Sequence, residues 1–350
     1  MVVQSAQTLT ELGERIFAAV GSPPDIARRV AEALVDANLC GHDSHGVIRI
    51  PSYVEAVKAG HVIADARPAT LRETAVTALV DGRWAFGQVS AAYGTRIAIE
   101  KARASGVAVV GIVRCNHIGR LGEYATMGSD AGVILLIVAS GFGGRGVTAV
   151  PFGGAKPLFG TNPIAVGIPA GAEPDVLVDF ATTAIAAGKI EVARAKKIPL
   201  PPGAIVDREG RPTTDPEDYY RGGALLPFGG HKGYALSVVV EFLGRIVTGA
   251  DFYAEGERGG PVYGRSGTLI LALDPGVFVR PEAYAQTADE TLRRLKAVPP
   301  APGSPGVLIP GEPEARARAE RTSGGIPLAE ETWEKILATA RALGITEIPA

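Results

Sequence analysis

Apolar residues recur at helical spacing along the first sixty residues of the chain. One predicted helix follows Ser22-Pro23-Pro24-Asp25, and its apolar positions share one face: Ile26, Val30, Leu34 and Ala37. An earlier helix is predicted over Thr8 to Val20, with Thr8-Leu9-Thr10-Glu11 as its capping box. A short third helix is expected to end at Gly60. We therefore expect residues 1–75 to form a helical lobe.

From Val76 onward the pattern changes to β-branched runs bounded by Gly, Pro or Asp, which is typical of strands. Six runs are predicted strands: Val76–Val80, Val107–Val113, Val133–Val138, Ile164–Ile168, Val176–Val178 and Leu269–Leu273. Helical patterns lie at Ser90–Ala104, Gly122–Ala131, Tyr234–Ile246 and Pro281–Leu295. Residues 76–280 are therefore predicted to form a mixed α/β domain. A linker rich in Pro and Gly, residues 299–306, precedes two terminal helices.

Composition narrows the class of protein. The formal charge is −2, which weighs against nucleic acid or an anionic membrane as the main partner. The longest apolar run, Val133 to Ala139, is too short to span a bilayer, and the start of the chain lacks the pattern of a secretion signal. The two cysteines, Cys40 and Cys115, have no metal-ligand spacing. We expect a cytoplasmic protein without a disulfide framework or a structural metal.

The richest chemistry lies between Gly41 and Val54. Two of the five histidines of the chain, His42 and His45, stand here with Asp43, Ser44, Arg49 and Tyr53. Histidine exchanges protons near neutral pH, and arginine binds a carboxylate through two parallel hydrogen bonds. The stretch therefore suits a 2-oxo or 2-hydroxy acid. The alternative interpretation is a helix cap made by Asp43 or Ser44, with both histidines as surface residues.

Two further polar clusters follow predicted strands. Asn116-His117-Ile118-Gly119-Arg120 offers a second histidine and arginine, and Asp179 ends another strand. Asp179 is suited to orient an imidazole, although Thr182 could equally cap a helix there. Ser44, His45 and Asp179 form an alternative nucleophilic triad, but no GxSxG elbow occurs in the chain. His42 and His45 as metal ligands would need a third ligand that the spacing does not identify.

Two glycine-rich segments are candidates for phosphate binding. Gly141–Gly146 matches GxGxxG after a strand, but Val147–Gly154 cannot form the helix that a Rossmann site requires, so we reject that interpretation. Gly229-Gly230-His231-Lys232-Gly233 places backbone donors, an imidazole and an ammonium before an apolar helix. This arrangement favours a phosphate or pyrophosphate over an ordinary turn.

Six short segments together carry a resemblance to a known family: Gly41–Gly46 with Arg49 and Tyr53, Asn116–Arg120, Phe159–Pro163, Asp179–Thr182, His231–Tyr234 and Pro310–Glu312. They resemble the malate/L-lactate dehydrogenase family, and within it the hydroxycarboxylate dehydrogenases. The resemblance implies NAD- or NADP-dependent interconversion of 2-oxo acids and 2-hydroxy acids by a homodimer. It implies a mixed α/β fold: a non-Rossmann NAD(P)-binding domain with a largely antiparallel sheet, and a helical lobe built from both termini, completed by residues 281–350. The segment Ser140–Gly146 is more glycine-rich than the family pattern.

The resemblance also assigns roles to residues. His45 and His117 are implied proton donors or acceptors, with Ser44 beside them. Asp179 would orient or charge-balance an imidazole, while Arg49 and Tyr53 would meet the substrate carboxylate. The cofactor would contact these residues: His45, Gly119, Arg120, Leu121, Leu177, Val178, Asp179, Phe180, Ala181, His231, Lys232, Pro310, Gly311 and Glu312. Three alternatives stay open: reduction of a cyclic imine acid, a cofactor-free hydrolase, and a nucleotide-binding protein without activity.

Overall fold

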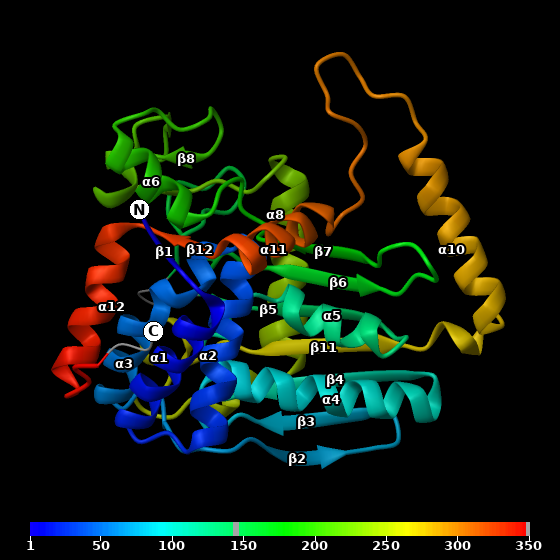
Figure 1. Ribbon diagram of the computed structural model, residues 1–350, viewed down its shortest axis with the longest axis horizontal. Coiled ribbons are helices and arrows are strands. Elements are labelled where there is room, and N and C mark those ends of the chain that lie inside the picture. Colours follow the sequence, from blue (N-terminus) through cyan, green and yellow to red (C-terminus); the bar gives the residue numbers. More distant parts are fainter. Residues whose placement is uncertain (143–146, 348–350) are drawn as a thin grey trace.

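The computed structural model describes residues 1–142 and 147–347. Figure 1 shows a helical lobe beside a large sheet that has helices on both of its faces. The strands of that sheet, in spatial order, are β2 (Ala69–Glu73), β3 (Thr77–Asp81), β4 (Val107–Val113), β11 (Thr268–Leu273), β5 (Ile134–Ala139), β6 (Ile164–Ile168) and β7 (Val176–Phe180). Only the pair β3–β4 is parallel. The prediction of a largely antiparallel, non-Rossmann sheet is therefore confirmed.

The helical lobe draws on both ends of the chain. Its elements are α1 (Ala6–Ala19), α2 (Pro24–Leu39), α3 (Ile50–Lys58), α12 (Glu330–Ala342) and the antiparallel pair β1 (Val2–Gln4) and β12 (Ile326–Leu328). One buried core joins them, and it includes Leu12, Phe17 and Leu34 from the first part of the chain and Ile326 and Ile336 from the last. The prediction of a lobe built from both termini is confirmed.

Helices cover both faces of the sheet because successive strand residues point to opposite sides. On one face, α4 (Gly87–Ser105) and α5 (Gly122–Asp130) cover a core that includes Ile112, Ile137 and Ile270. On the other face, Val138 and Leu269 pack with α8 (His231–Glu241) and the π-helix Phe242–Val247 that continues it. The strand runs predicted at Val107–Val113 and Ile164–Ile168 match β4 and β6 at both ends.

The segment between β7 and α8 forms a small subdomain. It contains α6 (Ala187–Lys196), α7 (Pro216–Tyr220) and a three-stranded sheet of β8 (Ile205–Val206), β9 (Pro212–Thr213) and β10 (Ala224–Leu225). After β11, α10 (Pro281–Lys296) packs on the turn between β6 and β7, where Asp289 accepts hydrogen bonds from three backbone N–H groups. Helix α11 (Glu312–Gly324) then packs against α2. The division into domains at residues 75 and 280 stays a prediction.

Three predicted helix starts are wrong, and one of them is that of α4, which begins at Gly87 and not at Ser90. Helix α1 begins at Ala6, because Ser5 Oγ accepts a hydrogen bond from Thr8 N at 2.9 Å and caps the helix in place of the Thr8–Glu11 box. Helix α8 begins at His231, because Gly229 and Gly230 take positive φ angles of 55° and 63° that end the preceding turn. His231 and Lys232 therefore lie within the first helical turn and not before it.

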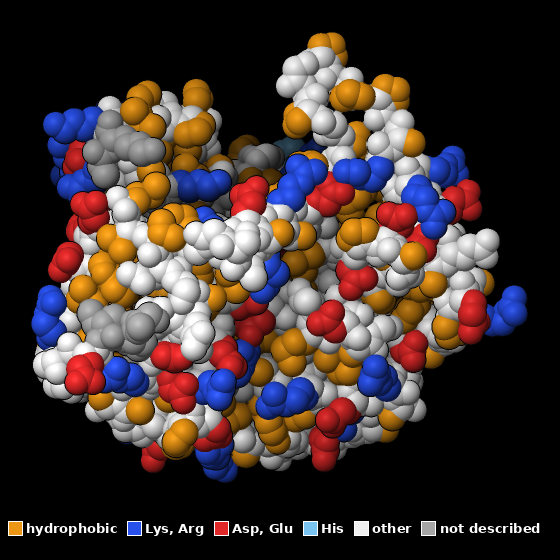
Figure 2. All heavy atoms as spheres, viewed as in Figure 1, with side chains coloured by type: hydrophobic (Ala, Val, Ile, Leu, Met, Phe, Trp, Pro, Cys, Tyr) orange, Lys and Arg blue, Asp and Glu red, His pale blue; other side chains and the backbone are white. Residues whose placement is uncertain are grey.

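Two surface features bear on partners. Among the described residues, every helix is either too short or too polar to cross a bilayer. On the face seen in Figure 2, acidic and basic side chains alternate without a broad area of one sign. That face has no extended basic surface of the kind that binds nucleic acid.

Candidate active site

A buried amide of helix α2 holds the loop that carries His45. Residues Asp43–His45 and Val47–Arg49 each form a single turn of 3-10 helix. Asn38 Oδ1 accepts a hydrogen bond from Val47 N at 2.8 Å, and Asn38 Nδ2 donates to Asp43 Oδ1 at 2.7 Å. A Cβ atom at Gly46 would lie 2.1 Å from Asn38 Oδ1, so only glycine fits there. Asn38 and Gly46 thus hold this loop in one conformation.

The interpretation of this stretch as a helix cap is wrong. Helix α3 has Arg49 at its N-cap position and no side-chain cap hydrogen bond. Asp43 instead binds Asn38 and accepts a hydrogen bond from Arg321 Nη1 of α11 at 2.6 Å. Ser44 Oγ lies 3.0 Å from His45 Nδ1. The polar groups of the loop therefore bond to one another and to residues of α2 and α11.

The structure brings His45 and His117 together from distant parts of the chain. Their ring centroids are 5.5 Å apart, and the ring planes differ by 22°. Nδ1 of His45 faces Ser44, while Nδ1 of His117 lies 2.6 Å from Tyr53 Oη. Within the described residues, neither ring uses its Nε2 in a hydrogen bond. Each imidazole therefore keeps one nitrogen for a ligand.

The backbone of His117 is fixed by tight packing at the end of β4. Asn116 Nδ2 donates hydrogen bonds to Trp84 O and Ala85 O, both at 3.0 Å. Gly87, the first residue of α4, packs so closely that a Cβ atom there would lie 2.2 Å from His117 O. The loop before α4 and the strand end therefore hold each other in place.

The side chain of Tyr53 is buried and lies against the ring of His117. Its hydroxyl oxygen accepts a hydrogen bond from Gln88 Nε2 at 2.8 Å and pairs with His117 Nδ1. The Tyr53 side chain is buried, and so is Gln88. The polar atom of Tyr53 is thus bonded to His117 and Gln88, and its predicted contact with the substrate carboxylate stays a prediction.

Arg49 is placed to bind an anion beside the two imidazoles. Its Nε donates to Ser44 O at 2.6 Å, which fixes the orientation of the guanidinium. Its two terminal nitrogens make no hydrogen bond or ion pair with any described residue. Its positive charge lowers the pKa of both His45 and His117. Arg49 therefore keeps the N–H groups of both terminal nitrogens unpaired among the described residues.

Burial decides the charge state of the site. Burial lowers the pKa of His45 to about 3, and the positive charge of Arg49 lowers it further. Burial and the same arginine hold the pKa of His117 well below its ordinary value. Burial raises the pKa of Tyr53, so this phenol keeps its proton. In the free protein at neutral pH, both imidazoles are uncharged.

Asp179 stands apart from both rings. Its Oδ2 accepts a hydrogen bond from Gly122 N at 2.7 Å, and it makes no hydrogen bond to His45 or His117. Burial raises its pKa, while the charges of His42 and Arg120 oppose that rise. The described residues therefore do not assemble a Ser44–His45–Asp179 triad. The role of Asp179 in orienting or charge-balancing an imidazole stays a prediction.

The segments predicted to hold the cofactor meet around β7. Leu177 N donates to Pro310 O at 2.9 Å, and a Cβ atom at Gly311 would lie 2.9 Å from Leu177 Cβ. Asp179 contacts the turn after His117 through Gly122. Phe228, just before α8, donates from N to Thr182 O at 3.1 Å. Strand β7 thus contacts Gly122 and Pro310, and Thr182, two residues beyond its end, contacts Phe228 just before α8.

Arg120 is the most unusual charged group in this region. It is buried, and its Nη2 donates to Asp36 Oδ2 at 2.9 Å. Its Nε and Nη1 are buried without a hydrogen-bond partner among the described residues. Unpaired buried donors are costly, so a negatively charged ligand would stabilise them. His231 and Lys232 are exposed in the first turn of α8, where the helix dipole also favours an anion.

The glycine-rich segment Gly141–Gly146 is only partly described. Gly160 N donates to Gly141 O at 2.6 Å, and Phe142 forms a β-bridge with Phe159. Residues 143–146 lie outside the described residues. No helix occurs over 147–163, which agrees with rejecting the Rossmann interpretation. Asn162, in the Phe159–Pro163 motif, is buried and accepts a hydrogen bond from Gly141 N, so this motif supports the fold.

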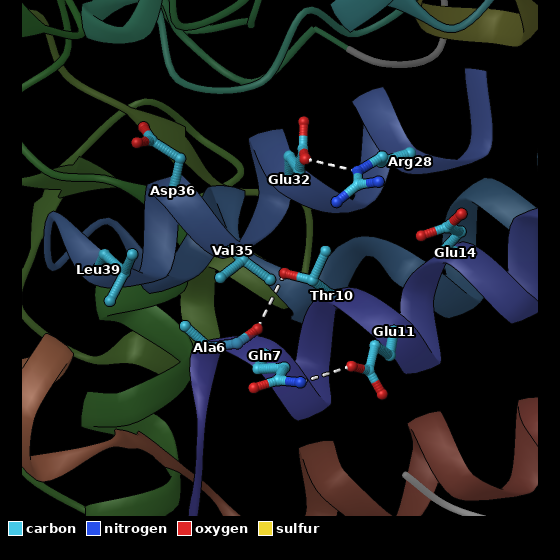
Figure 3. A pocket seen from close by; sticks show the side chains of 10 residues that line it. All are labelled: Ala6, Gln7, Thr10, Glu11, Glu14, Arg28, Glu32, Val35, Asp36 and Leu39. Carbon is cyan, nitrogen blue, oxygen red and sulfur yellow. Dashed lines mark hydrogen bonds and ion pairs between the residues drawn. The ribbon is translucent and has the colours of Figure 1, made fainter. Parts of the chain in front are cut away.

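An opening lies between α1 and α2 (Figure 3), with a volume of about 490 Å³. Its charged groups include Glu11, Glu14 and Glu32, and Arg28 Nε donates to Glu32 Oε1 at 2.9 Å. None of its lining residues is a predicted site residue. Over residues 1–142 and 147–347, no three His, Cys, Asp or Glu side chains are grouped as metal ligands. His42 instead pairs with Glu314 at 3.4 Å.

Known proteins match this chain over nearly its whole length, both in sequence and in structure. A family model described as malate/L-lactate dehydrogenase matches residues 4–337. The L-sulfolactate dehydrogenase of Methanothermobacter thermautotrophicus is 39% identical, over 95% of this chain and 94% of that protein. Hydroxycarboxylate dehydrogenase B of Escherichia coli is 38% identical, over 98% and 94%. The structure of delta1-piperideine-2-carboxylate reductase from Pseudomonas syringae superposes with a TM-score of 0.85 at 34% identity, over 97% and 100% of the chains.

Proposed function

Because the chain belongs to the malate/L-lactate dehydrogenase family, we propose that it is a nicotinamide-dependent oxidoreductase that interconverts 2-oxo acids and 2-hydroxy acids. One observation supports this most: His45 and His117 lie side by side, and the positive charge of Arg49, whose terminal nitrogens are unpaired, acts on both rings. A 2-oxo acid needs a cation for its carboxylate and a proton donor for its oxo group. The site offers both kinds of group.

Arg49 binds the substrate carboxylate in this proposal. Its two terminal nitrogens match the two carboxylate oxygens, and the hydrogen bond from Nε to Ser44 O keeps the guanidinium in place. The bound carboxylate offsets the positive charge that lowers the pKa of the neighbouring imidazoles. Substrate binding and proton uptake by the site are therefore coupled.

His117 exchanges the proton with the substrate oxygen through Nε2. Its other ring nitrogen is bonded to the buried hydroxyl of Tyr53, which fixes the orientation of the ring. His45 lies beside it with its own Nδ1 facing Ser44 and serves as the second polar contact of the substrate oxygen. General acid–base help of this kind contributes about 10²- to 10⁴-fold.

The cofactor, NAD or NADP, binds along β7 in the same proposal. The unpaired Nε and Nη1 of Arg120 and the first turn of α8 suit its negatively charged phosphates. In this proposal the cofactor is surrounded by three segments: Leu177–Ala181, Gly119–Leu121 and Pro310–Glu312. A bound nicotinamide supplies the hydride to C2 of the oxo acid, or accepts it from the hydroxy acid. Initial rates with NADH and with NADPH identify the preferred form.

Substitution of Arg49 tests this function. Loss of two charged hydrogen bonds, each of about 1.5–3 kcal/mol, predicts that Arg49→Ala raises KM for 2-oxo acids at least about 100-fold. Arg49→Lys keeps the charge but not the paired geometry, so its KM should fall between. Arg67→Ala is the matched control, because Arg67 forms an exposed ion pair with Asp25. Unchanged KM and kcat in Arg49→Ala would contradict the proposal.

A second candidate substrate is a cyclic imine acid. The structural similarity to delta1-piperideine-2-carboxylate reductase favours it, and Arg49 would bind the same carboxylate. Pyruvate, oxaloacetate, sulfopyruvate and piperideine-2-carboxylate should be compared at equal concentration through the absorbance of the reduced cofactor. Turnover of the imine acid alone would select this alternative. Ester or amide hydrolysis without cofactor would instead support the hydrolase interpretation.

We extend the proposal to a homodimer in the cytoplasm. One side of α8 and the π-helix exposes apolar side chains, and the following loop adds a ring that is 92% exposed: Val239, Phe242, Ile246, Val247 and Phe252. An exposed apolar area of this kind favours contact with a second copy of the chain. Cys40 and Cys115 are both buried free thiols, which suits a reducing compartment. Sedimentation velocity checks the assembly, and a monomer at micromolar concentration would contradict it.

A further inference from the structure

We propose that Gln88 is a positioning residue for proton transfer at His117, because its buried amide sets the direction of the hydrogen bond between Tyr53 and His117. The inference rests on the proposed function of His117. It assigns to Gln88 no contact with substrate or cofactor. Its whole effect passes through the Tyr53 hydroxyl.

The contacts form a short chain in the interior. Gln88 lies in the first turn of α4 and is 0% exposed. Its Nε2 donates to Tyr53 Oη at 2.8 Å, and Tyr53 Oη lies 2.6 Å from His117 Nδ1. Gln88 Oε1 is also buried and has no hydrogen-bond partner among the described residues. A buried amide oxygen without a partner costs about 1–3 kcal/mol, so it calls for an explanation.

Counting hydrogens shows what the amide does. The Tyr53 hydroxyl has a single hydrogen. When Gln88 Nε2 donates to Tyr53 Oη, that hydrogen goes to His117 Nδ1. The neutral imidazole then carries its own hydrogen on Nε2, and Nε2 can only donate. In this arrangement His117 can polarise the oxo group of a substrate, but it cannot take a proton from a hydroxy acid.

A half-turn of the amide reverses the chain. Gln88 Oε1 then accepts the hydrogen of Tyr53, and Tyr53 Oη accepts a hydrogen bond from His117 Nδ1–H. His117 Nε2 is left without a hydrogen and can accept a proton from the hydroxyl of a 2-hydroxy acid. The two arrangements contain the same number of hydrogen bonds, because one end of the amide is unpaired in each. Neither arrangement is therefore strongly favoured by its hydrogen bonds.

The neighbourhood leaves room for this half-turn. Gly119 faces the amide, and a Cβ atom there would lie 3.2 Å from Gln88 Nε2. Gly119 also has a φ angle of 77°, which side chains other than glycine rarely adopt. The two ends of an amide have nearly the same shape, so the reversal moves no other group. Glycine at position 119 therefore allows the positive φ of the turn and also leaves space beside the amide of Gln88.

The test reads the tautomer of His117 by ¹⁵N NMR. The chain has five histidines, so the ring nitrogens can be assigned in a sample labelled at histidine. We expect wild-type His117 to show shifts averaged between its two neutral tautomers. In Gln88→Met, Tyr53 has only His117 to donate to, so the shifts should move to those of the Nε2–H form alone. A wild-type ring already fixed in one tautomer, or identical shifts in Gln88→Met, would overturn the proposal.

Kinetics supply the second readout. We expect Gln88→Met to lower kcat/KM about tenfold in both directions, as a fixed reaction equilibrium requires, and to displace the acid limb of the pH profile. In the background Tyr53→Phe, which has no hydroxyl, the same change should have no further effect. Gln7→Met is the matched control, since Gln7 binds only exposed Glu11 on α1. Additive losses from Tyr53→Phe and Gln88→Met would refute the coupling.

The two proposals can fail separately. The NMR measurement needs no substrate, so a tautomer shift in Gln88→Met would stand even if no oxo acid were reduced. In that case the proposed function would fall while the effect of Gln88 on His117 remained. Turnover of oxo acids with a tautomer that ignores Gln88 would give the opposite result. If Gln88→Met does not fold, the wild-type tautomer alone still decides the inference.

Discussion

Acid should destabilise this protein through its buried histidines. Burial and nearby cations lower the pKa of His45 to about 3 in the folded chain, whereas an unfolded histidine titrates near ~6.5. Between these two values the unfolded state binds a proton that the folded state does not. Stability therefore falls as the pH drops from about 6.5 toward 3 and is fully present above about 6.5.

The size of the effect follows from the same two values. A pH of 5 lies about 1.5 units below the pKa of the unfolded histidine, and each unit is worth about 1.4 kcal/mol. Protonation of His45 in the unfolded state alone therefore lowers the free energy of unfolding by about 2 kcal/mol. His117 contributes in the same direction, because its pKa is also held well below the ordinary value. Buried carboxyls act in the opposite sense, since burial raises the pKa of Glu123 and Glu241.

A difference between two variants isolates the histidine from those carboxyls. Urea unfolding of the wild type and of His45→Asn should be measured at pH 7.5 and at pH 5. We expect the free energy of unfolding to fall by about 2 kcal/mol less in His45→Asn than in the wild type. Equal losses in the two proteins would mean that the ring titrates normally when folded. The reasoning about neutral imidazoles in the free enzyme would then be wrong.

The elements predicted correctly are those in which one local signal acts alone. Strands β4 and β6 are dense β-branched runs, so their ends match the structure. The start of α8 was missed because two glycines with positive φ moved it to His231, which hydropathy does not register. The short strands β8, β9 and β10 have two residues each, so no periodicity can reveal them.

The site shows the same division between local and tertiary signals. His45 and His117 stand out because histidine is rare in the chain, and their meeting depends on the packing of Gly87 against the end of β4. Asn38 could have been noticed, because it continues the apolar face of Leu34 one helical turn on. Gln88 had no such signal, since the helix was predicted to begin at Ser90. Its importance comes only from the burial that tertiary structure imposes.

Substitutions of two residues that make no proposed contact with substrate, Asn38 and Gly87, test what positions His45 and His117. Asn38→Ala leaves Val47 N–H buried without a partner, so the free energy of unfolding in urea should fall by about 1–3 kcal/mol and kcat should fall with it, because the His45 loop is released. Unchanged stability would mean that water replaces the amide. Gly87→Ala places a methyl group 2.2 Å from His117 O, so the strand end must shift and kcat should fall at least tenfold. Gly324→Ala is the control, because no atom lies within 4 Å of its Cβ position. Full activity in Gly87→Ala would show that His117 does not depend on this contact for its place beside His45.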